Sequence, residues 1–269
     1  GCGWLFGFLS FQVQCGHFGH WRGIFLVNFI VSGDLFHIGI ADRVILVAKI
    51  EIGHQGTEFL CLRAHGLTGG CSLLDEPGEW YLDGTAGTLF YWPLPGEDMT
   101  RAEVVAPVLG ELLRFEGDAD KDELVRHVHV EDLSLQHADW TLGPHGYGND
   151  PQAAVTIGAA VTADGAHDCV LDRCEVTHVE GYGVWFRRGC KRCQITHSEV
   201  HDLGAGGLRL GEPHMAQTEE AMSSHNEIVN NYIHDGGHVY PEGVGFWMAH
   251  ASHNRIAHNE IHSFDYSGM

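Results

Sequence analysis

Small and apolar residues recur at fixed offsets through the second half of the chain. Each copy holds two such residues two positions apart, followed three positions later by a second pair with the same spacing. The copies are Val128, Val130, Leu133 and Leu135; Cys169, Leu171, Cys174 and Val176; Cys193, Ile195, Ser198 and Val200; Asn226, Ile228, Asn231 and Ile233; and Asn254, Ile256, Asn259 and Ile261. Successive copies begin 24 to 41 residues apart. Self-similarity of this kind predicts a solenoid.

The offsets indicate which solenoid to expect. Side chains alternate between faces along a strand, so steps of two place these residues on one inward face. The step of three breaks that alternation and predicts a bend between two short strands. A third strand, punctuated by glycine, follows at residues 181–186, 206–210 and 243–248. No apolar pattern of period 3.6 is present, so we predict an all-β fold, a right-handed single-stranded parallel β-helix with three short strands per coil.

Equivalent positions of neighbouring coils should stack about 4.8 Å apart. The asparagines at the first and third repeat positions then form two columns, Asn226 with Asn254 and Asn231 with Asn259. Stacked amides can hydrogen-bond along such a column. We therefore predict a structural role for these asparagines.

Four of the eight cysteines lie in the repeats and have a spacing that superficially resembles a zinc site. Cys169 and Cys193, however, occupy the first position of adjacent coils, where Val128 stands in the apolar copy. The repeat therefore predicts stacked core residues rather than metal ligands. A disulfide between stacked neighbours stays open for an exported protein.

Three segments are predicted along the chain. Residues 124–269 form the β-helix, and residues 71–123 form a smaller β segment that includes an aromatic-rich hairpin around a glycine-bearing turn. Residues 1–70 contain few charges and no repeat. They lack a basic segment before an apolar run, as a signal peptide would have, and residues 23–31 are too short to span a bilayer. A genuine N-terminal β-domain and a truncated, non-native start are equally compatible with this segment.

The charge balance narrows the class of partner. Lys and Arg total 15 against 36 Asp and Glu, a formal net charge of −21. Such an acidic chain is a poor ligand for nucleic acid or for an anionic membrane surface. A neutral or cationic partner suits this charge better, and we expect no membrane span and a monomeric protein.

Carboxylates at the coil corners and in the loops between coils are the candidate catalytic groups. Asp202 and Asp235 share the position nine residues into consecutive repeats, which predicts carboxyl groups about 5 Å apart. Capping of the turn by hydrogen bonds to backbone N–H groups is the alternative role for both. Glu212 begins one loop that leaves the coil, and Glu242 and Asp265 have weaker claims to catalysis.

Candidate substrate-binding residues follow from the same alignment. Trp185 and Trp247 hold equivalent places on the third strand, where they offer either a platform for a sugar ring or core packing. Arg209 lies between them in the coil order. The remaining candidates lie near coil corners or in loops: His238, Tyr240 and His250.

Several segments resemble bacterial right-handed parallel β-helix proteins similar to glycoside hydrolase family 141. They are residues 76–83, 87–93, 179–187, 201–212 and 252–262, and the resemblance extends over about 72–269. It implies an extracellular or periplasmic enzyme that cleaves glycosidic bonds in complex, plant-derived polysaccharides. We therefore expect a polysaccharide or oligosaccharide substrate, and separately we expect no cofactor. Members of that family continue for several more coils, so the resemblance also implies a chain that is incomplete at both ends.

Two other functions remain open from the sequence. A polysaccharide lyase on the same fold would use a Lys or Arg base, often with calcium held by acidic residues. Only two lysines follow Asp118, but Arg187, Arg188 and Arg209 keep this possibility open. A non-catalytic glycan-binding or surface β-helix needs no carboxylate pair, and the fold alone does not choose among the three.

Overall fold

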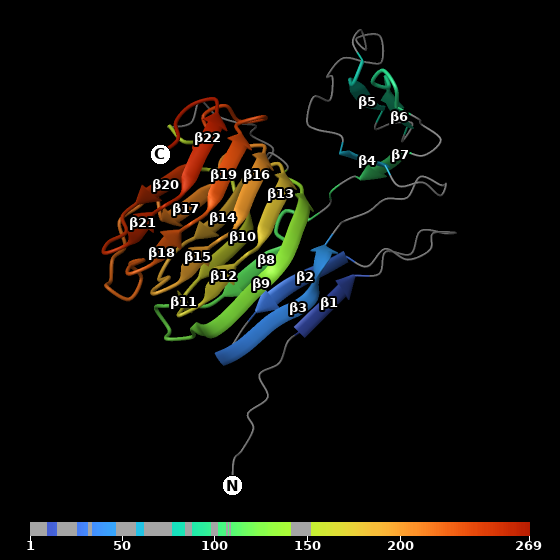
Figure 1. Cartoon of the computed structure of the whole chain (residues 1–269). Helices are drawn as coiled ribbons and strands as arrows, with labels where there is room; N and C mark the ends of the chain where they lie inside the picture. The colour runs from blue at the N-terminus through green and yellow to red at the C-terminus, as the bar shows by residue number, and fades with distance from the viewer. Residues whose placement is uncertain are drawn as a thin grey trace. The chain divides into compact units, whose positions relative to one another are not determined.

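The computed structural model describes residues 10–14, 26–31, 34–46, 58–61, 77–83, 88–97, 102–105, 107, 109–140 and 152–269. The chain divides into two compact units (Figure 1). One unit comprises Gly1–Ala48 with Val108–Met269, and the other is Lys49–Pro107.

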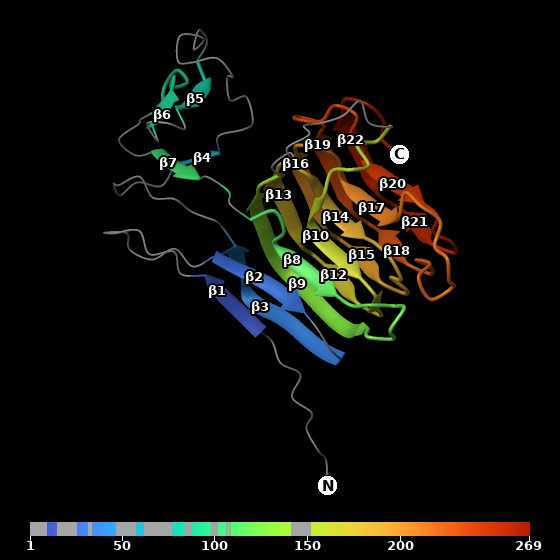
Figure 2. The same ribbon diagram turned by 180° about the vertical axis from the view of Figure 1, so that it is seen from behind.

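The larger unit is a stack of parallel coils, each with strands on three faces (Figure 2). The first face contains β12 (Val170–Asp172), β15 (Gln194–Thr196), β18 (Glu227–Val229) and β21 (Arg255–Ala257). The second contains β13 (Glu175–Val179), β16 (Glu199–Leu203), β19 (Tyr232–Gly236) and β22 (Glu260–Phe264). The third contains β8 (Leu113–Glu116), β10 (Ala159–Asp164), β14 (Tyr182–Phe186), β17 (Leu208–Gly211) and β20 (Phe246–Ala249).

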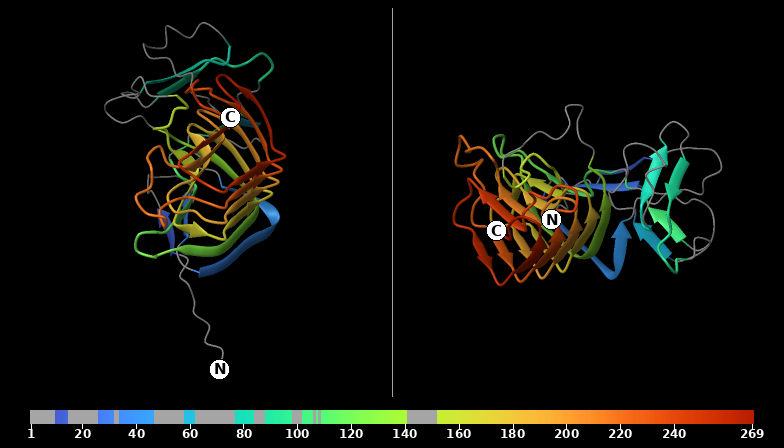
Figure 3. Two further views of the ribbon diagram at one scale, coloured as in Figure 1. Left: turned by 90° about the vertical axis from the view of Figure 1, so that its left-hand side faces the viewer. Right: turned by 90° about the horizontal axis from the view of Figure 1, so that it is seen from above.

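One long strand, β9 (Val125–Ala138), runs across both the first and second faces. The short strand β11 (Ala166–His167) also pairs with it. The strand ladders of successive coils are seen edge-on in Figure 3. Parallel pairing of equivalent strands confirms the predicted coil repeat.

The corners of the coil explain the offsets of the repeat. A residue with a left-handed backbone occurs every five positions, three times in each of five coils, with φ between 50° and 64°. These residues are His127, Asp132 and His137; Asp168, Arg173 and His178; Arg192, His197 and Asp202; His225, Asn230 and Asp235; and His253, His258 and Ser263. Asp, Asn and His are the non-glycine residues that most readily adopt this conformation. The predicted bend lies at the middle residue of each trio.

The inward-facing columns form the hydrophobic core. Leu171 pairs with Val130 in one neighbouring coil and with Ile195 in the other, and Ile195 pairs with Ile228. The four repeat cysteines are buried and carry free thiols. Burial raises the pKa of Cys174 to about 11, so this thiol is neutral at pH 7. The prediction that the cysteines fill the core is confirmed.

The predicted asparagine columns are also present. Asn231 Oδ1 accepts the N–H of Ser198 at 3.0 Å, and Asn231 Nδ2 donates to the carbonyl of Ile195 at 2.8 Å and to Asn259 Oδ1 at 3.0 Å. Asn226 makes the equivalent bonds one corner earlier. Each buried amide therefore satisfies backbone groups of the preceding coil and an amide of the next.

The coil extends further toward the N-terminus than the sequence indicated. β2 (Leu26–Val31) pairs in parallel with β8, and β3 (Asp34–Leu46) pairs with β9. β1 (Ser10–Gln14) pairs antiparallel with β2. The predicted boundaries at residues 70 and 123 therefore differ from the observed division, since N-terminal strands share sheets with the coil.

The smaller unit has two short sheets. β5 (Trp80–Asp83) and β6 (Thr88–Tyr91) form the predicted antiparallel hairpin. β4 (Glu58–Cys61) and β7 (Ala102–Val105) pair in parallel. Among the described residues, the structure contains no helix with the length and apolar character needed to cross a bilayer.

Candidate functional site

The outer surface of the third face carries a column of large polar and aromatic side chains. Register places one residue from each strand in the column, namely Arg114, Thr162, Trp185, Arg209 and Trp247. Parallel strands put such neighbours about 4.8 Å apart. The column therefore brings together the two tryptophans and the arginine that were predicted to bind substrate.

Arg209 lies between the two tryptophans of this column and is 1% exposed. Its guanidinium carbon lies 3.6 Å from the ring centre of Trp185 and 4.8 Å from that of Trp247. Its two terminal nitrogens donate to the carbonyls of Ile157 and Val155 at 2.8 and 2.9 Å. Burial lowers the pKa of Arg209 to about 10, yet it stays protonated at neutral pH. Arg209 thus fixes the aromatic rings and the 155–157 segment.

A carboxylate pair lies beside this column, at the ends of β10 and β17. Arg187 Nε is 3.6 Å from Asp164 Oδ1 and 3.4 Å from Glu212 Oε1. The two oxygens are therefore at most about 7 Å apart, compatible with the roughly 5–9.5 Å of glycosidase carboxyl pairs. The Arg187 guanidinium also lies 4.7 Å from the ring centre of Trp185. Arg187 thus connects the carboxylates to the aromatic column.

The chain reaches Glu212 through a turn that requires glycine. Gly211 has a φ of 87°, and a Cβ there would lie 2.0 Å from the carbonyl oxygen of Ala249. The carbonyl of Gly211 accepts a hydrogen bond from Trp185 Nε1 at 2.7 Å. These contacts fix the backbone immediately before Glu212.

The two carboxyl groups have different environments. Burial raises the pKa of Asp164, and the negative charges of Glu212 and Glu111 raise it further, whereas Arg187 and Arg114 oppose the shift. Glu111 is held nearby, since its Oε1 accepts the hydroxyl of Thr162 at 2.9 Å. A carboxyl group that retains its proton can act as a general acid. Asp164 is therefore the acid candidate of the pair.

A pocket of about 270 Å³ opens over the pair. Asp164, Arg187 and Glu212 line it together with His214 and His250. Most of these side chains are polar or charged, as expected of a site for a hydroxyl-rich ligand.

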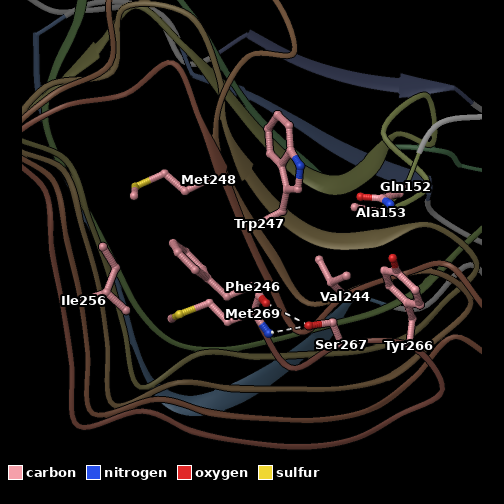
Figure 4. A pocket seen from close by; sticks show the side chains of 10 residues that line it. All are labelled: Gln152, Ala153, Val244, Phe246, Trp247, Met248, Ile256, Tyr266, Ser267 and Met269. Atoms are coloured by element: carbon pink, nitrogen blue, oxygen red, sulfur yellow. Dashed lines mark hydrogen bonds between the residues drawn. The ribbon is translucent and has the colours of Figure 1, made fainter.

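A larger pocket, of about 920 Å³, lies at the last coil (Figure 4). Its lining is mainly apolar and includes Val244, Phe246 and Ile256, and Trp247 from the aromatic column also reaches it. Ser267 Oγ donates to the backbone oxygen of Met269 at 2.7 Å within it. The described residues that line this pocket include no Asp or Glu, so its size does not make it the better catalytic candidate.

Asp202 and Asp235 lie at adjacent rungs of one corner, as the offsets predicted, because His201 pairs with His234 and Leu203 with Gly236. Their environments differ. Asp202 is 7% exposed and is bonded to His178, whereas the side chain of Asp235 is 53% exposed and accepts from His234 Nδ1 at 3.0 Å. The pair lies at the end of the second face, away from Glu212 at the end of the third. Its predicted catalytic role stays a prediction.

The remaining predicted residues are dispersed. His250 is exposed and lines the pocket with Glu212, whereas His238 Nε2 lies 3.9 Å from Asp202 Oδ1. Glu242 is half-buried in the loop before β20, and Asp265 is exposed after β22. The structure thus groups Glu212 and His250 near Trp185 and places Glu242 and Asp265 elsewhere.

A second carboxylate pair surrounds Tyr240. Burial raises the pKa of Glu180, and the charge of Asp139 raises it further. Burial also raises the pKa of Tyr240, followed by the charges of Glu180 and Asp139. Tyr240 is 5% exposed, so it contributes to packing beside this pair.

Sequence reasoning missed Asp164 and did not connect Arg187 to Glu212. Asp164 ends a third strand, Ala159–Asp164, that lacks the glycines by which the other copies were found. Alignment by register would have placed Asp164 beside Arg187, because Ala163 pairs with Phe186. Asp164 could therefore have been found from its position in the aligned strands, but not from a sequence motif.

Comparisons with known proteins agree with this architecture. A family model described as "Right handed beta helix region" matches residues 158–269. A solved structure named "Glycoside hydrolase" is similar with a TM-score of 0.63 and 23% sequence identity. The similarity covers 73% of this chain and 39% of that one, so the chain spans well under half of its structural neighbour. No curated protein matches the chain significantly.

The chain contains a right-handed parallel β-helix. This confirms the predicted fold class, including its handedness. The comparisons identify no numbered glycoside hydrolase family, so the resemblance to family 141 stays a prediction.

Proposed function

We propose that this β-helix protein hydrolyses glycosidic bonds in a polysaccharide or oligosaccharide. The observation that carries the proposal is the Asp164–Glu212 pair held by Arg187 beside Trp185. The similarity to a structure named glycoside hydrolase supports the same class of reaction. A polysaccharide substrate is also consistent with an exported, monomeric protein, which we propose in agreement with the sequence.

In the proposed reaction, Asp164 donates its proton to the glycosidic oxygen as the bond to the anomeric carbon breaks. Glu212 acts as the second carboxylate, which either attacks the anomeric carbon or removes a proton from the attacking water. Arg187 contacts both carboxylates and orients them. Trp185 and Trp247 offer apolar ring faces on which sugar rings stack.

The experiment is a product assay on a panel of plant polysaccharides. New reducing ends without an ultraviolet-absorbing unsaturated sugar are expected, and both Asp164→Asn and Glu212→Gln should abolish them. Glu227→Gln on the first face is the matched control, because its carboxylate only faces Arg255 at 3.7 Å on the surface. Unsaturated products would instead support the polysaccharide lyase. Saturable glycan binding without products would support the non-catalytic alternative.

A further inference from the structure

The outer surface of the second face carries a column of histidines next to a column of carboxylates. Register aligns His201 with His234 and His234 with His262, while Glu175 aligns with Glu199. The rings of His201 and His234 stack with centres 5.0 Å apart and an interplanar angle of 9°. The two imidazoles therefore present the same edge in the same direction.

That edge faces the carboxylates. His201 Nε2 lies 3.4 Å from Glu175 Oε1, and His234 Nε2 lies 3.2 Å from Glu199 Oε1. Ligand atoms of Glu175, Glu199 and His201 all lie within 4.8 Å of one another. In a tetrahedral zinc site with nitrogen and oxygen ligands, the ligand atoms are about 3.3–3.6 Å apart. The His201–Glu175 distance already matches this spacing, and the His234–Glu199 distance is slightly shorter. The Glu199 side chain is 46% exposed and has room to rotate inward.

The opposite nitrogen of each ring is oriented by a second group. Thr177 Oγ1 lies 3.4 Å from His201 Nδ1, and Asp235 Oδ2 lies 3.0 Å from His234 Nδ1. Histidine ligands in metal sites are held in this way through the ring nitrogen that does not bind the metal. This arrangement gives Asp235 a positioning role that differs from the catalytic one predicted from the sequence.

Glu175 is also held in place. Its Oε2 accepts from the Ser134 hydroxyl and from Gln136 Nε2, the latter at 3.3 Å. Both donors come from β9, so this strand fixes the Glu175 carboxylate beside His201.

A similar group on the first face differs in one respect. His129, Glu131 and Asp172 also have ligand atoms close together, but Arg173 lies between the acids. Its Nη2 is 2.7 Å from Glu131 Oε2, and Nη1 is bonded to Asp172. The guanidinium already supplies the positive charge that a cation would bring. This first-face group is therefore not a candidate cation site.

We propose that Glu175, Glu199, His201 and His234 form a binding site for a zinc-like divalent cation. Two imidazoles with two carboxylates favour zinc over calcium or magnesium, which prefer oxygen ligands alone. The site lies on a different face from Asp164 and Glu212. Its zinc binding can therefore be tested independently of the proposed hydrolase activity.

The test is zinc titration of the metal-free full chain by calorimetry, with equilibrium dialysis to count bound metal. We expect one zinc ion per chain and no displacement by equimolar calcium. Asp235→Asn should weaken zinc binding by about 10–100-fold, as loss of an outer-shell partner does elsewhere. His201→Gln combined with His234→Gln should remove saturable binding.

His262→Gln is the matched control, because it removes an imidazole from the same column whose Nε2 lies 2.9 Å from the Tyr232 hydroxyl. This variant should bind zinc as the wild type does. The thermal midpoint without metal checks that every variant is folded. Absence of saturable zinc binding, unchanged binding by the double variant, or equal displacement by calcium would each overturn the proposal.

Discussion

Asp164 Oδ1 lies 3.6 Å from Arg187 Nε, yet the pKa of this carboxyl group is raised rather than lowered. Burial of Asp164 is the largest cause, and the charges of Glu212 and Glu111 add to it. The arginine opposes the shift without cancelling it. The side chain is thus poised to hold a proton beside a second carboxylate, which is the arrangement an acid catalyst needs.

Replacing Arg187 should move the alkaline limb of the pH profile. An acid catalyst works only while protonated, so kcat/KM falls as pH rises through the pKa of Asp164. Arg187→Gln removes a charge that lowers this pKa, so the alkaline limb should move to higher pH. The measurement is kcat/KM against pH for wild type and variant, with Arg188→Gln as a control on the neighbouring surface arginine. An unchanged or downward-shifted limb would contradict the assignment of Asp164 as the acid.

Asp164→Asn should stabilise the protein at neutral pH while abolishing hydrolysis of the polysaccharide. A carboxyl whose folded pKa is raised contributes stability below its unfolded pKa, and that contribution is lost as pH rises through the folded pKa. The neutral amide never carries the buried charge. We expect a gain on the order of 1 kcal/mol per unit of raised pKa at pH 7, and none at strongly acidic pH. Urea unfolding at several pH values tests this, and a loss of stability at neutral pH would contradict it.

Breaking an asparagine column should lower the free energy of unfolding. Asn231→Ala leaves the Ser198 N–H and the Ile195 carbonyl without their buried partner. Loss of these bonds should lower the free energy of unfolding by about 2–4 kcal/mol. Asn230→Asp is the control, since residue 230 is exposed and aspartate also tolerates its φ of 59°. Equal unfolding midpoints for the two variants would contradict the structural role of the column.

Arg209→Lys should weaken both the fold and substrate binding. Lysine lacks the planar guanidinium, which donates to the two carbonyls through separate nitrogens and stacks flat between Trp185 and Trp247. We expect a loss of about 2–4 kcal/mol in stability, together with a higher KM. Arg188→Lys, at a 41% exposed side chain paired with Asp120, should cost less than about 1 kcal/mol. A tolerated Arg209→Lys with wild-type KM would show that the aromatic column does not depend on Arg209.

The coil was predictable because strand alternation is a local rule. Leu171 and Ile195 face the core for the same reason in every turn, and their offsets are visible in the sequence. The pairing of β2 and β3 with the coil was not predictable, because these strands contain no copy of the repeat. The register of β3 places Phe36 and Ile38 opposite Val128 and Val130, and Val44 and Leu46 opposite Leu133 and Leu135. An irregularity between Gly39 and Val44 changes the spacing of these pairs, so the offsets of the repeat do not find them.

The candidate site was only partly predictable. Glu212 was found because it begins a loop that leaves the coil. The pairing of Asp164 with Glu212 depends on Arg187, a side chain long enough to reach both carboxylates from the strand between them. The outward histidines His201 and His234 recur at one repeat position, but their closeness to Glu175 and Glu199 also required the register. Contacts between side chains of neighbouring coils depend on how far each side chain extends. The spacing of residues in the sequence does not give this information.

The most direct test of the central claim compares two substrates with Asp164→Asn. A polysaccharide linkage needs a proton on its leaving oxygen, whereas an aryl glycoside with a strongly acidic phenol does not. The account predicts that the variant loses hydrolysis of the polysaccharide but retains cleavage of the activated glycoside, while Glu212→Gln loses both. Equal loss of the two activities in Asp164→Asn, or full retention of both, would contradict the role of Asp164 as the proton donor.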